Sequence, residues 1–123
     1  MQHSPEFVAL VDDAKARVRE ISTDDWVRRT GAGEHLQLVD VREDGEWQAG
    51  HASGATHLGR GVIERDVVGR FPDKDTPLVL YCGGGFRSAL AADNLQKMGY
   101  RQVWSLAGGW KAWLAAGLPT RQP

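Results

Sequence analysis

Residues 77–88 have the sequence Pro77-Leu78-Val79-Leu80-Tyr81-Cys82-Gly83-Gly84-Gly85-Phe86-Arg87-Ser88. The apolar run from Leu78 to Tyr81 lacks polar alternation, which is typical of a strand covered on both faces of a parallel sheet. The single cysteine of the chain, Cys82, follows this run and opens a loop of three glycines. A helix is expected to start at Ser88 and to end at Gly99. This stretch therefore joins a strand, a thiol, a flexible loop and a helix without a gap.

The rest of the chain also alternates between helix and strand patterns. Further strands are predicted at residues 20–22, 36–41, 55–58 and 103–106. Further helices are predicted over residues 6–19, from Ser22 or Thr23 to about Thr30, through Trp47 to Gly50, over 64–71, and from Gly108-Gly109 to Gly117. In the helix over 64–71, Val67, Val68 and Phe71 are expected to face the core. This alternation predicts an α/β fold with a mainly parallel sheet, in which ligands bind at the carboxyl ends of strands, where Cys82 lies.

Length and composition narrow the class of protein. The chain has 123 residues, of which 41% are hydrophobic, as expected for one globular domain. A net charge of −1 gives no indication of a nucleic-acid or membrane-surface partner. One cysteine cannot form an internal disulfide, and the four histidines show no metal-ligand spacing. The start of the chain lacks a signal-peptide pattern, so a cytoplasmic location is expected.

The residues around Cys82 favour a nucleophile. Backbone N–H groups of the glycine loop can converge on the sulfur, the next helix directs its positive end at the loop, and Arg87 adds a positive charge. All three features favour the thiolate over the thiol. The alternative is a buried structural cysteine before a loose turn. The strand, glycines, arginine and helix in register favour the reactive cysteine.

The spacing between Cys82 and Arg87 indicates which chemistry the loop accommodates. Four residues separate the two, whereas cysteine-dependent phosphatases and arsenate reductases of related architecture have five, which make room for a tetrahedral oxyanion. The tighter loop suits one additional sulfur atom, carried as a persulfide on Cys82. A reductase would also need a second thiol, which the chain lacks.

Four motifs resemble those of the rhodanese (thiosulfate sulfurtransferase) family, single-domain type. They are Val39-Asp40-Val41-Arg42-Glu43, Gly50-His51-Ala52-Ser53-Gly54-Ala55, the loop from Cys82 to Ser88, and Gly108-Gly109-Trp110-x-x-Trp113. Their order and spacing agree with the family from about Ile21 to Pro119. Residues 1–19 lie outside the resemblance and are interpreted as an N-terminal helical extension, with the rhodanese-like domain over residues 20–123.

The resemblance implies a five-stranded, mainly parallel sheet flanked by helices on both sides. It also implies a sulfurtransferase without a cofactor or metal, in which Cys82 takes sulfur from thiosulfate or from a low-molecular-weight or protein persulfide and passes it to a thiol or cyanide. Substrate-binding residues carried over from the family are Gly83, Gly84, Gly85, Phe86, Arg87 and Ser88. Arg42 and Arg60 are further candidates.

One departure from the family bears on the sulfur donor. Several members that use thiosulfate have a basic residue directly after the cysteine or within the loop. Here those positions hold Gly83 to Phe86, and Arg87 is the only cation of the loop. This favours a less charged persulfide or a protein partner over the thiosulfate dianion.

Several alternatives stay open at the level of sequence. The domain could be a regulatory or binding module without turnover, although inactive relatives typically lack the cysteine, or a phosphatase or arsenate reductase, which the loop spacing opposes. Asp40 is interpreted as structural, at a strand end. Arg42 fits both the pocket and an ion pair across the fold, and Arg60 fits both the site and the solvated surface.

Overall fold

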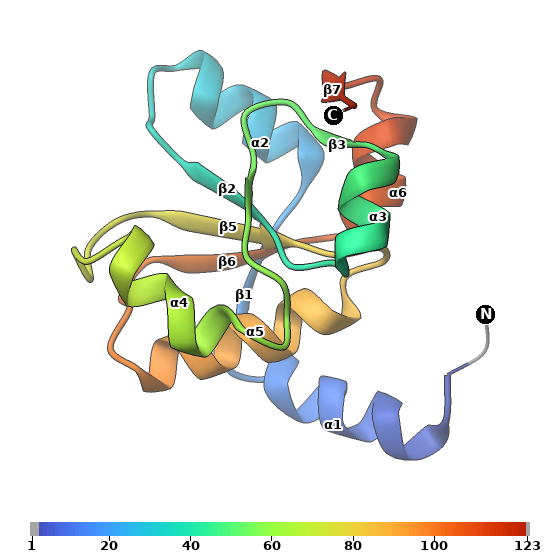
Figure 1. The fold of residues 1–123 in the computed structure, drawn as a ribbon, viewed down its shortest axis with the longest axis vertical. Helices are drawn as coiled ribbons and strands as arrows, with labels where there is room; N and C mark the ends of the chain where they lie inside the picture. Colours follow the sequence, from blue (N-terminus) through green and yellow to red (C-terminus); the bar gives the residue numbers. More distant parts are fainter. Residues whose placement is uncertain (1–2, 123) are drawn as a thin grey trace.

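The computed structural model of the protein describes residues 3–122, and its centre is one five-stranded sheet in which every strand is parallel to its neighbours (Figure 1). The strand order is β1-β6-β5-β2-β4. Their bounds are β1 Arg19–Ile21, β2 Gln37–Asp40, β4 Thr56–His57, β5 Leu78–Tyr81 and β6 Val103–Leu106. The predicted α/β fold with a five-stranded parallel sheet is thus confirmed.

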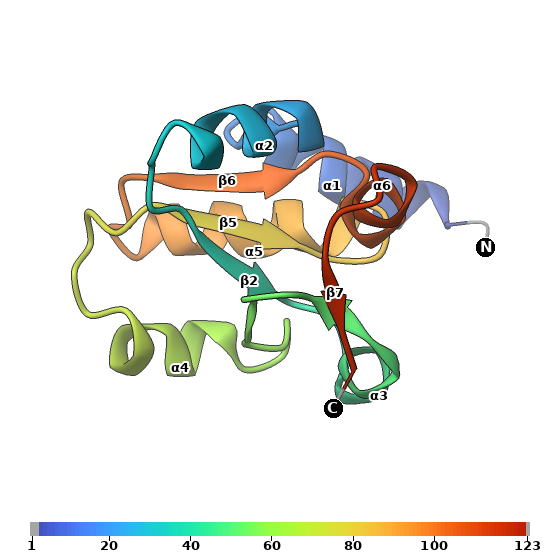
Figure 2. The ribbon, with the colours of Figure 1, turned by 90° about the horizontal axis from the view of Figure 1, so that it is seen from above.

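Six helices lie around this sheet in the described part of the chain. They are α1 Pro5–Lys15, α2 Thr23–Gly31, α3 Asp44–Ala49, α4 Ile63–Arg70, α5 Phe86–Lys97 and α6 Gly109–Ala115. Figure 1 shows α2 above the sheet and α4 and α5 below it, and Figure 2, which looks onto the sheet, shows α5 behind β5. Helix α6 packs on the same core as α2. Within residues 3–122, no helix is long and apolar enough to cross a membrane.

The central strand β5 explains why the sheet is covered on both faces. All four of its residues are fully buried. Leu78 and Leu80 belong to the core beneath α4 and α5, whereas Val79 and Tyr81 belong to the core beneath α2 and α6. Successive side chains of a strand point to opposite faces, so a run of four apolar residues fills both cores at once.

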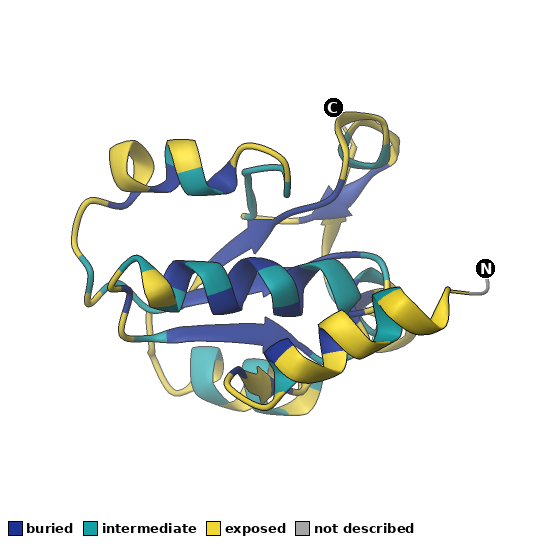
Figure 3. Cartoon of the chain, turned by 90° about the horizontal axis from the view of Figure 1, so that it is seen from below, coloured by how far each residue is buried: buried dark blue, intermediate teal, exposed yellow. Residues whose placement is uncertain are grey.

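Helix α1 packs outside these layers, against α5 (Figure 3). Its Val11 and Ala14 are buried, and Arg17, just after the helix, bonds Asp93 of α5 with an Nη2–Oδ2 distance of 2.8 Å. The predicted helix over residues 6–19 is too long at its end, because Arg19 already pairs with Trp104 as the first residue of β1. Residues 1, 2 and 123 of the predicted extension and domain lie outside the described residues.

Other sequence predictions differ from the structure in detail. Val68 is 41% exposed, because it lies about 100° around α4 from the buried Val67, so the prediction that it faces the core is wrong. Helix α5 begins two residues before Ser88, at Phe86. A small antiparallel sheet of β3 (His51–Ala52) and β7 (Thr120–Arg121) was not predicted.

Candidate active site

Cys82 lies at the carboxyl end of β5, the central strand of the sheet, and only 1% of it is exposed. Its Sγ accepts a hydrogen bond from the Gly85 N–H at 3.1 Å. The same sulfur lies 3.5 Å from the Ser88 Oγ, which is in turn 2.8 Å from the Ser105 Oγ of β6. Gly85 has a φ of +100°, a left-handed conformation that costs glycine little and lets the loop turn directly into α5.

Helix α6 contacts the backbone of the cysteine loop through two hydrogen bonds. The N–H of Trp110 donates to the Cys82 carbonyl at 2.7 Å, and the N–H of Lys111 donates to the Gly83 carbonyl at 3.2 Å. This approach requires glycine at 109, because its φ is +53° and a Cβ there would overlap the Cys82 carbonyl. The Gly108-Gly109 motif therefore fixes the carbonyl side of the loop against α6.

Most backbone N–H groups of the same loop have no hydrogen-bond acceptor among the described residues. Within residues 3–122, no acceptor is found for the N–H groups of Gly83, Gly84, Phe86 or Arg87. These four residues line a cavity of about 740 Å³ together with Cys82. The other lining residues are His3, Phe7, Glu46 and Lys111. Unpaired amides beside a thiol can stabilise negative charge on sulfur added to it.

Glu46, in the first turn of α3, is a cavity residue that the sequence did not indicate. Its two carboxylate oxygens accept hydrogen bonds from Arg87 at 2.7 and 3.1 Å. The Arg87 guanidinium lowers the pKa of Glu46 to about 2, against the opposing effect of partial burial. The pair is charged at neutral pH, so the positive charge of Arg87 is compensated by a carboxylate in the same cavity.

Arg42 is buried in a network rather than in the cavity wall. Its Nη2 lies 2.8 Å from Asp40 Oδ2 and donates to the Gly50 carbonyl at 2.7 Å, and its guanidinium lies 4.6 Å from the centre of the Trp110 ring. The Tyr81 hydroxyl donates to Asp40 at 2.5 Å, and burial raises the pKa of this tyrosine. The network links β2, β5 and the turn at Gly50.

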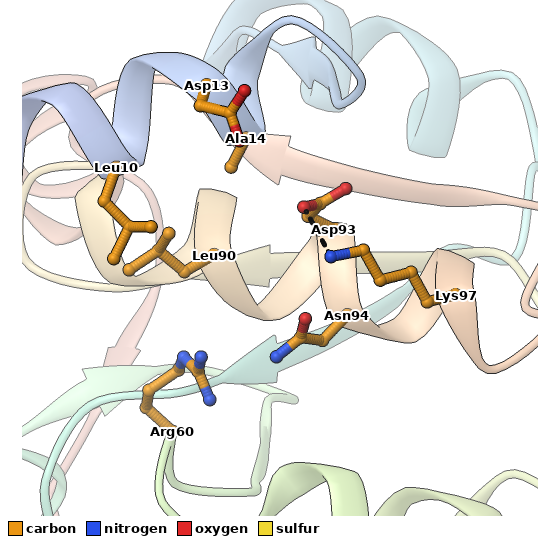
Figure 4. Close-up of a pocket in the computed structure, with 8 residues that line it drawn as sticks. All are labelled: Leu10, Asp13, Ala14, Arg60, Leu90, Asp93, Asn94 and Lys97. Carbon is orange, nitrogen blue, oxygen red and sulfur yellow. Dashed lines mark ion pairs between the residues drawn. The ribbon is translucent and has the colours of Figure 1, made fainter.

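Arg60 lies in a second cavity, of about 180 Å³, which includes residues of α1 and α5 (Figure 4). Its Nη1 is 2.8 Å from a carboxylate oxygen of Glu64. Of the predicted site residues, Cys82, Gly83, Gly84, Phe86 and Arg87 line the larger cavity. Gly85 and Ser88 contact the Cys82 sulfur instead, and Arg42 and Arg60 do not line this cavity.

The sequence also did not identify Ser105, His3 or Phe7 as site residues. Ser105 is an ordinary small residue in a strand pattern, and its place beneath Cys82 follows from the pairing of β5 with β6. The apolar spacing that includes Phe7 predicts an amphipathic helix, but it does not indicate which part of the domain Phe7 contacts.

Comparison with known proteins agrees with this geometry. A family model described as the rhodanese-like domain matches residues 23–116. The thiosulfate sulfurtransferase GlpE of Shewanella oneidensis is 35% identical over 95 residues, which cover 77% of this chain and 91% of that protein. The matched part covers 60% of one further curated relative and 28% of another.

Two solved structures superpose over nearly the whole chain. One is RPA3614 from Rhodopseudomonas palustris, a protein of unknown function described as a possible tyrosine phosphatase, with 30% identity, a TM-score of 0.81 and coverage of 98% of both chains. The other is the polysulfide-sulfur transferase homodimer of Wolinella succinogenes, with 29% identity, a TM-score of 0.79 and coverage of 96% of this chain and 88% of that one. The motifs, the fold and the family model agree, and the chain belongs to the rhodanese-like domain family.

Proposed function

We propose that the protein is a sulfurtransferase that carries sulfane sulfur as a persulfide on Cys82. The observation that supports this most strongly is the environment of the sulfur. Cys82 Sγ already accepts the Gly85 N–H at 3.1 Å, and four further loop residues with unpaired N–H groups line the cavity beside it. Relatives named as thiosulfate sulfurtransferases support the same kind of reaction.

The reaction consists of two displacements at sulfur. The Cys82 thiolate attacks the outer sulfur of the donor, a bond forms between Sγ and that sulfur, and the donor S–S bond breaks. Its electron pair leaves with sulfite, if the donor is thiosulfate, or with the thiolate of a persulfide donor. A cyanide ion or an acceptor thiolate then attacks the outer sulfur, and the electron pair of the broken bond returns to Cys82 Sγ. No oxidant or cofactor is needed.

The charges around the cavity favour a persulfide over thiosulfate as the donor. Thiosulfate carries two negative charges, and the one cation of the loop, Arg87, is already paired with Glu46. A dianion that binds at the cysteine loop must therefore lie next to a carboxylate or break the Arg87–Glu46 pair. The reacting group of a persulfide carries at most one negative charge. We infer weak saturation by thiosulfate and stronger binding of persulfide donors.

Replacing Glu46 with glutamine is expected to lower the KM for thiosulfate by about fivefold at low salt, because it leaves the charge of Arg87 uncompensated. The measurement is steady-state thiosulfate:cyanide sulfurtransferase activity at two ionic strengths. Because the pKa of Glu46 is about 2, the carboxylate stays ionised throughout pH 5–8, so the difference between the two proteins should hold over that range.

The matched control is Asp44→Asn, which removes the same charge from the same helix at a side chain that is 97% exposed. It is expected to change the KM for thiosulfate less than twofold, as for a screened surface charge. An unchanged or higher KM in Glu46→Gln would show that the Arg87–Glu46 pair does not limit binding of the dianion.

A phosphatase is the competing enzyme class, since the neighbour RPA3614 is described as a possible tyrosine phosphatase. Catalysis of phosphoryl transfer needs several donors spaced around the equatorial oxygens. Here four residues separate Cys82 from Arg87, and the arginine is bound to Glu46. We expect sulfur transfer from thiosulfate to cyanide that disappears in Cys82→Ser, and no comparable hydrolysis of a small aryl phosphate. The reverse result would favour the phosphatase, and neither activity would favour a binding module.

A further inference from the structure

The N-terminal segment supplies part of the cavity around Cys82. The His3 ring lies 4.5 Å from the Phe86 ring between centroids, and the Phe7 ring lies 6.1 Å from it. His3 and Phe7 are 5.1 Å apart by the same measure, so the three rings form one aromatic cluster. All three residues line the cavity, and only Phe86 belongs to the cysteine loop.

This aromatic cluster is held in place by the packing of α1. Val11 is fully buried and Ala14 is 2% exposed, on the side of α1 that faces α5. Arg17 bonds both Asp93 and Asp13, and its carbonyl accepts the Gln96 side-chain N–H at 3.0 Å. Figure 3 shows α1 running beside α5. Because these contacts fix the position of the helix, His3 and Phe7 at its start form a fixed wall of the cavity.

The size of the cavity suggests an organic ligand. A volume of about 740 Å³ lies within the range of about 300–1,000 Å³ that is usual for sites of organic small molecules. Cyanide and thiosulfate have no carbon skeleton that could pack on an aromatic surface. The cluster of His3, Phe7 and Phe86 offers such a surface to a carbon skeleton.

The charges of the cavity add a second feature of the ligand. Glu46 and Arg87 neutralise each other. Lys111 also lines the cavity, and it takes part in none of the ion pairs formed within residues 3–122. Lys15 also lies beside the aromatic residues, with its Nζ 5.3 Å from the centre of the Phe86 ring, but it does not line the cavity. Within the cavity Lys111 is thus a cation that has no ion-pair partner in the described part of the chain, which suits an organic molecule with a single carboxylate.

We propose that His3 and Phe7 determine the sulfur acceptor, which is a low-molecular-weight organic thiol that carries a carboxylate. Its carbon skeleton packs on the His3–Phe7–Phe86 cluster, and its carboxylate binds Lys111. The acceptor thiolate attacks the outer sulfur of the Cys82 persulfide and leaves as an organic persulfide, while the electron pair returns to Cys82. This inference rests on the proposed function, because it assigns an acceptor to the same reaction.

The test uses the full chain loaded with sulfur and then separated from the donor. Three acceptors are compared in single-turnover transfer: cyanide, 3-mercaptopropionate and the methyl ester of 3-mercaptopropionate. The native protein is expected to prefer the free acid over its ester at equal thiolate concentration. Lys111→Gln should reduce this preference by about threefold, as for one charge pair at an exposed site.

Phe7→Ala is expected to slow transfer to 3-mercaptopropionate by about tenfold and to leave transfer to cyanide within about twofold, since cyanide does not reach the aromatic wall. His3→Ala should also slow transfer to 3-mercaptopropionate. Because His3 lies before α1, this result would show that the effect of Phe7→Ala does not come from a defect in folding of the helix. The control Leu10→Ala truncates a 56% exposed side chain on the same helix and should change neither rate.

The outcomes separate this inference from the function on which it rests. If the native protein transfers sulfur to none of the acceptors, both fail. Transfer to cyanide with no preference for the acid, or Phe7→Ala and His3→Ala rates equal to native, overturns the acceptor assignment alone. Equal slowing of all three acceptors also overturns it, because that pattern indicates general distortion of the loop.

Discussion

Replacing Gly109 with alanine is expected to reduce sulfur transfer more than tenfold and to lower the free energy of unfolding by about 3 kcal/mol. The residue has a φ of +53°, and its new Cβ would overlap the Cys82 carbonyl. Helix α6 must move away, which breaks the hydrogen bonds from Trp110 to Cys82 and from Lys111 to Gly83. The loop would then lose the support that orients its backbone. Urea unfolding and single-turnover sulfur transfer measure the two effects.

Gly69→Ala in α4 is the matched control for this substitution. Gly69 lies within a helix, has no positive φ, and a Cβ there meets nothing within 4 Å. The change is expected to raise the free energy of unfolding by about 0.5–1 kcal/mol, because alanine loses less backbone entropy than glycine in a helix. Sulfur transfer should stay at the native rate. If Gly109→Ala behaved like Gly69→Ala, the close approach of α6 to Cys82 would not be required.

Asp40→Ala is expected to cost about 3–5 kcal/mol of folding free energy, because it leaves the buried Arg42 guanidinium without its counter-charge. The side chain of Arg42 is 4% exposed and that of Asp40 is fully buried. The Tyr81 hydroxyl loses its acceptor in the same step. Thermal and urea unfolding of the variant measure the loss.

Asp75→Ala provides the comparison for Asp40→Ala. Asp75 also pairs with an arginine, Arg101, but both side chains are at least 60% exposed. Exposed pairs contribute about 0–1 kcal/mol, so this variant should unfold close to the native protein. A difference of less than 1 kcal/mol between the two variants would mean that the Asp40–Arg42 network contributes little to stability.

Much of the fold follows from local sequence patterns. The five strands of the sheet correspond to apolar or mixed runs that were predicted, and β5 was the clearest because all four of its residues are apolar. Ser22, predicted as one of two possible caps, accepts the Asp25 N–H at the start of α2. Signals of this kind lie within a few residues of each other, which is why a single sequence reveals them.

Features that depend on distant partners could not be predicted in the same way. Glu46 and Arg87 are 41 positions apart, and neither shows a pattern that points to the other. Strands β3 and β7 have two residues each, too few for any periodicity. Phe7 meets Phe86 only because α1 packs on α5, and the spacing of apolar residues shows one face of a helix without showing what covers it.

Gly109 combines a feature that the sequence predicts with one that depends on contacts between distant residues. The sequence motif Gly108-Gly109 indicated the start of a helix and, by resemblance, the family. Only the structure shows that the second glycine permits contact with the carbonyl of the reactive cysteine. The motif was therefore recognised correctly, while its physical reason required the packing of α6 on the loop.

Intact mass spectrometry after treatment with thiosulfate, and separately with glutathione persulfide, tests the central claim most directly. The native protein is predicted to gain the mass of one sulfur atom, with glutathione persulfide loading more completely, and to lose it on treatment with cyanide. Cys82→Ser is predicted to gain nothing under either condition. A sulfur adduct on the serine variant, or no adduct on the native protein with either donor, would contradict the assignment of Cys82 as the sulfur carrier.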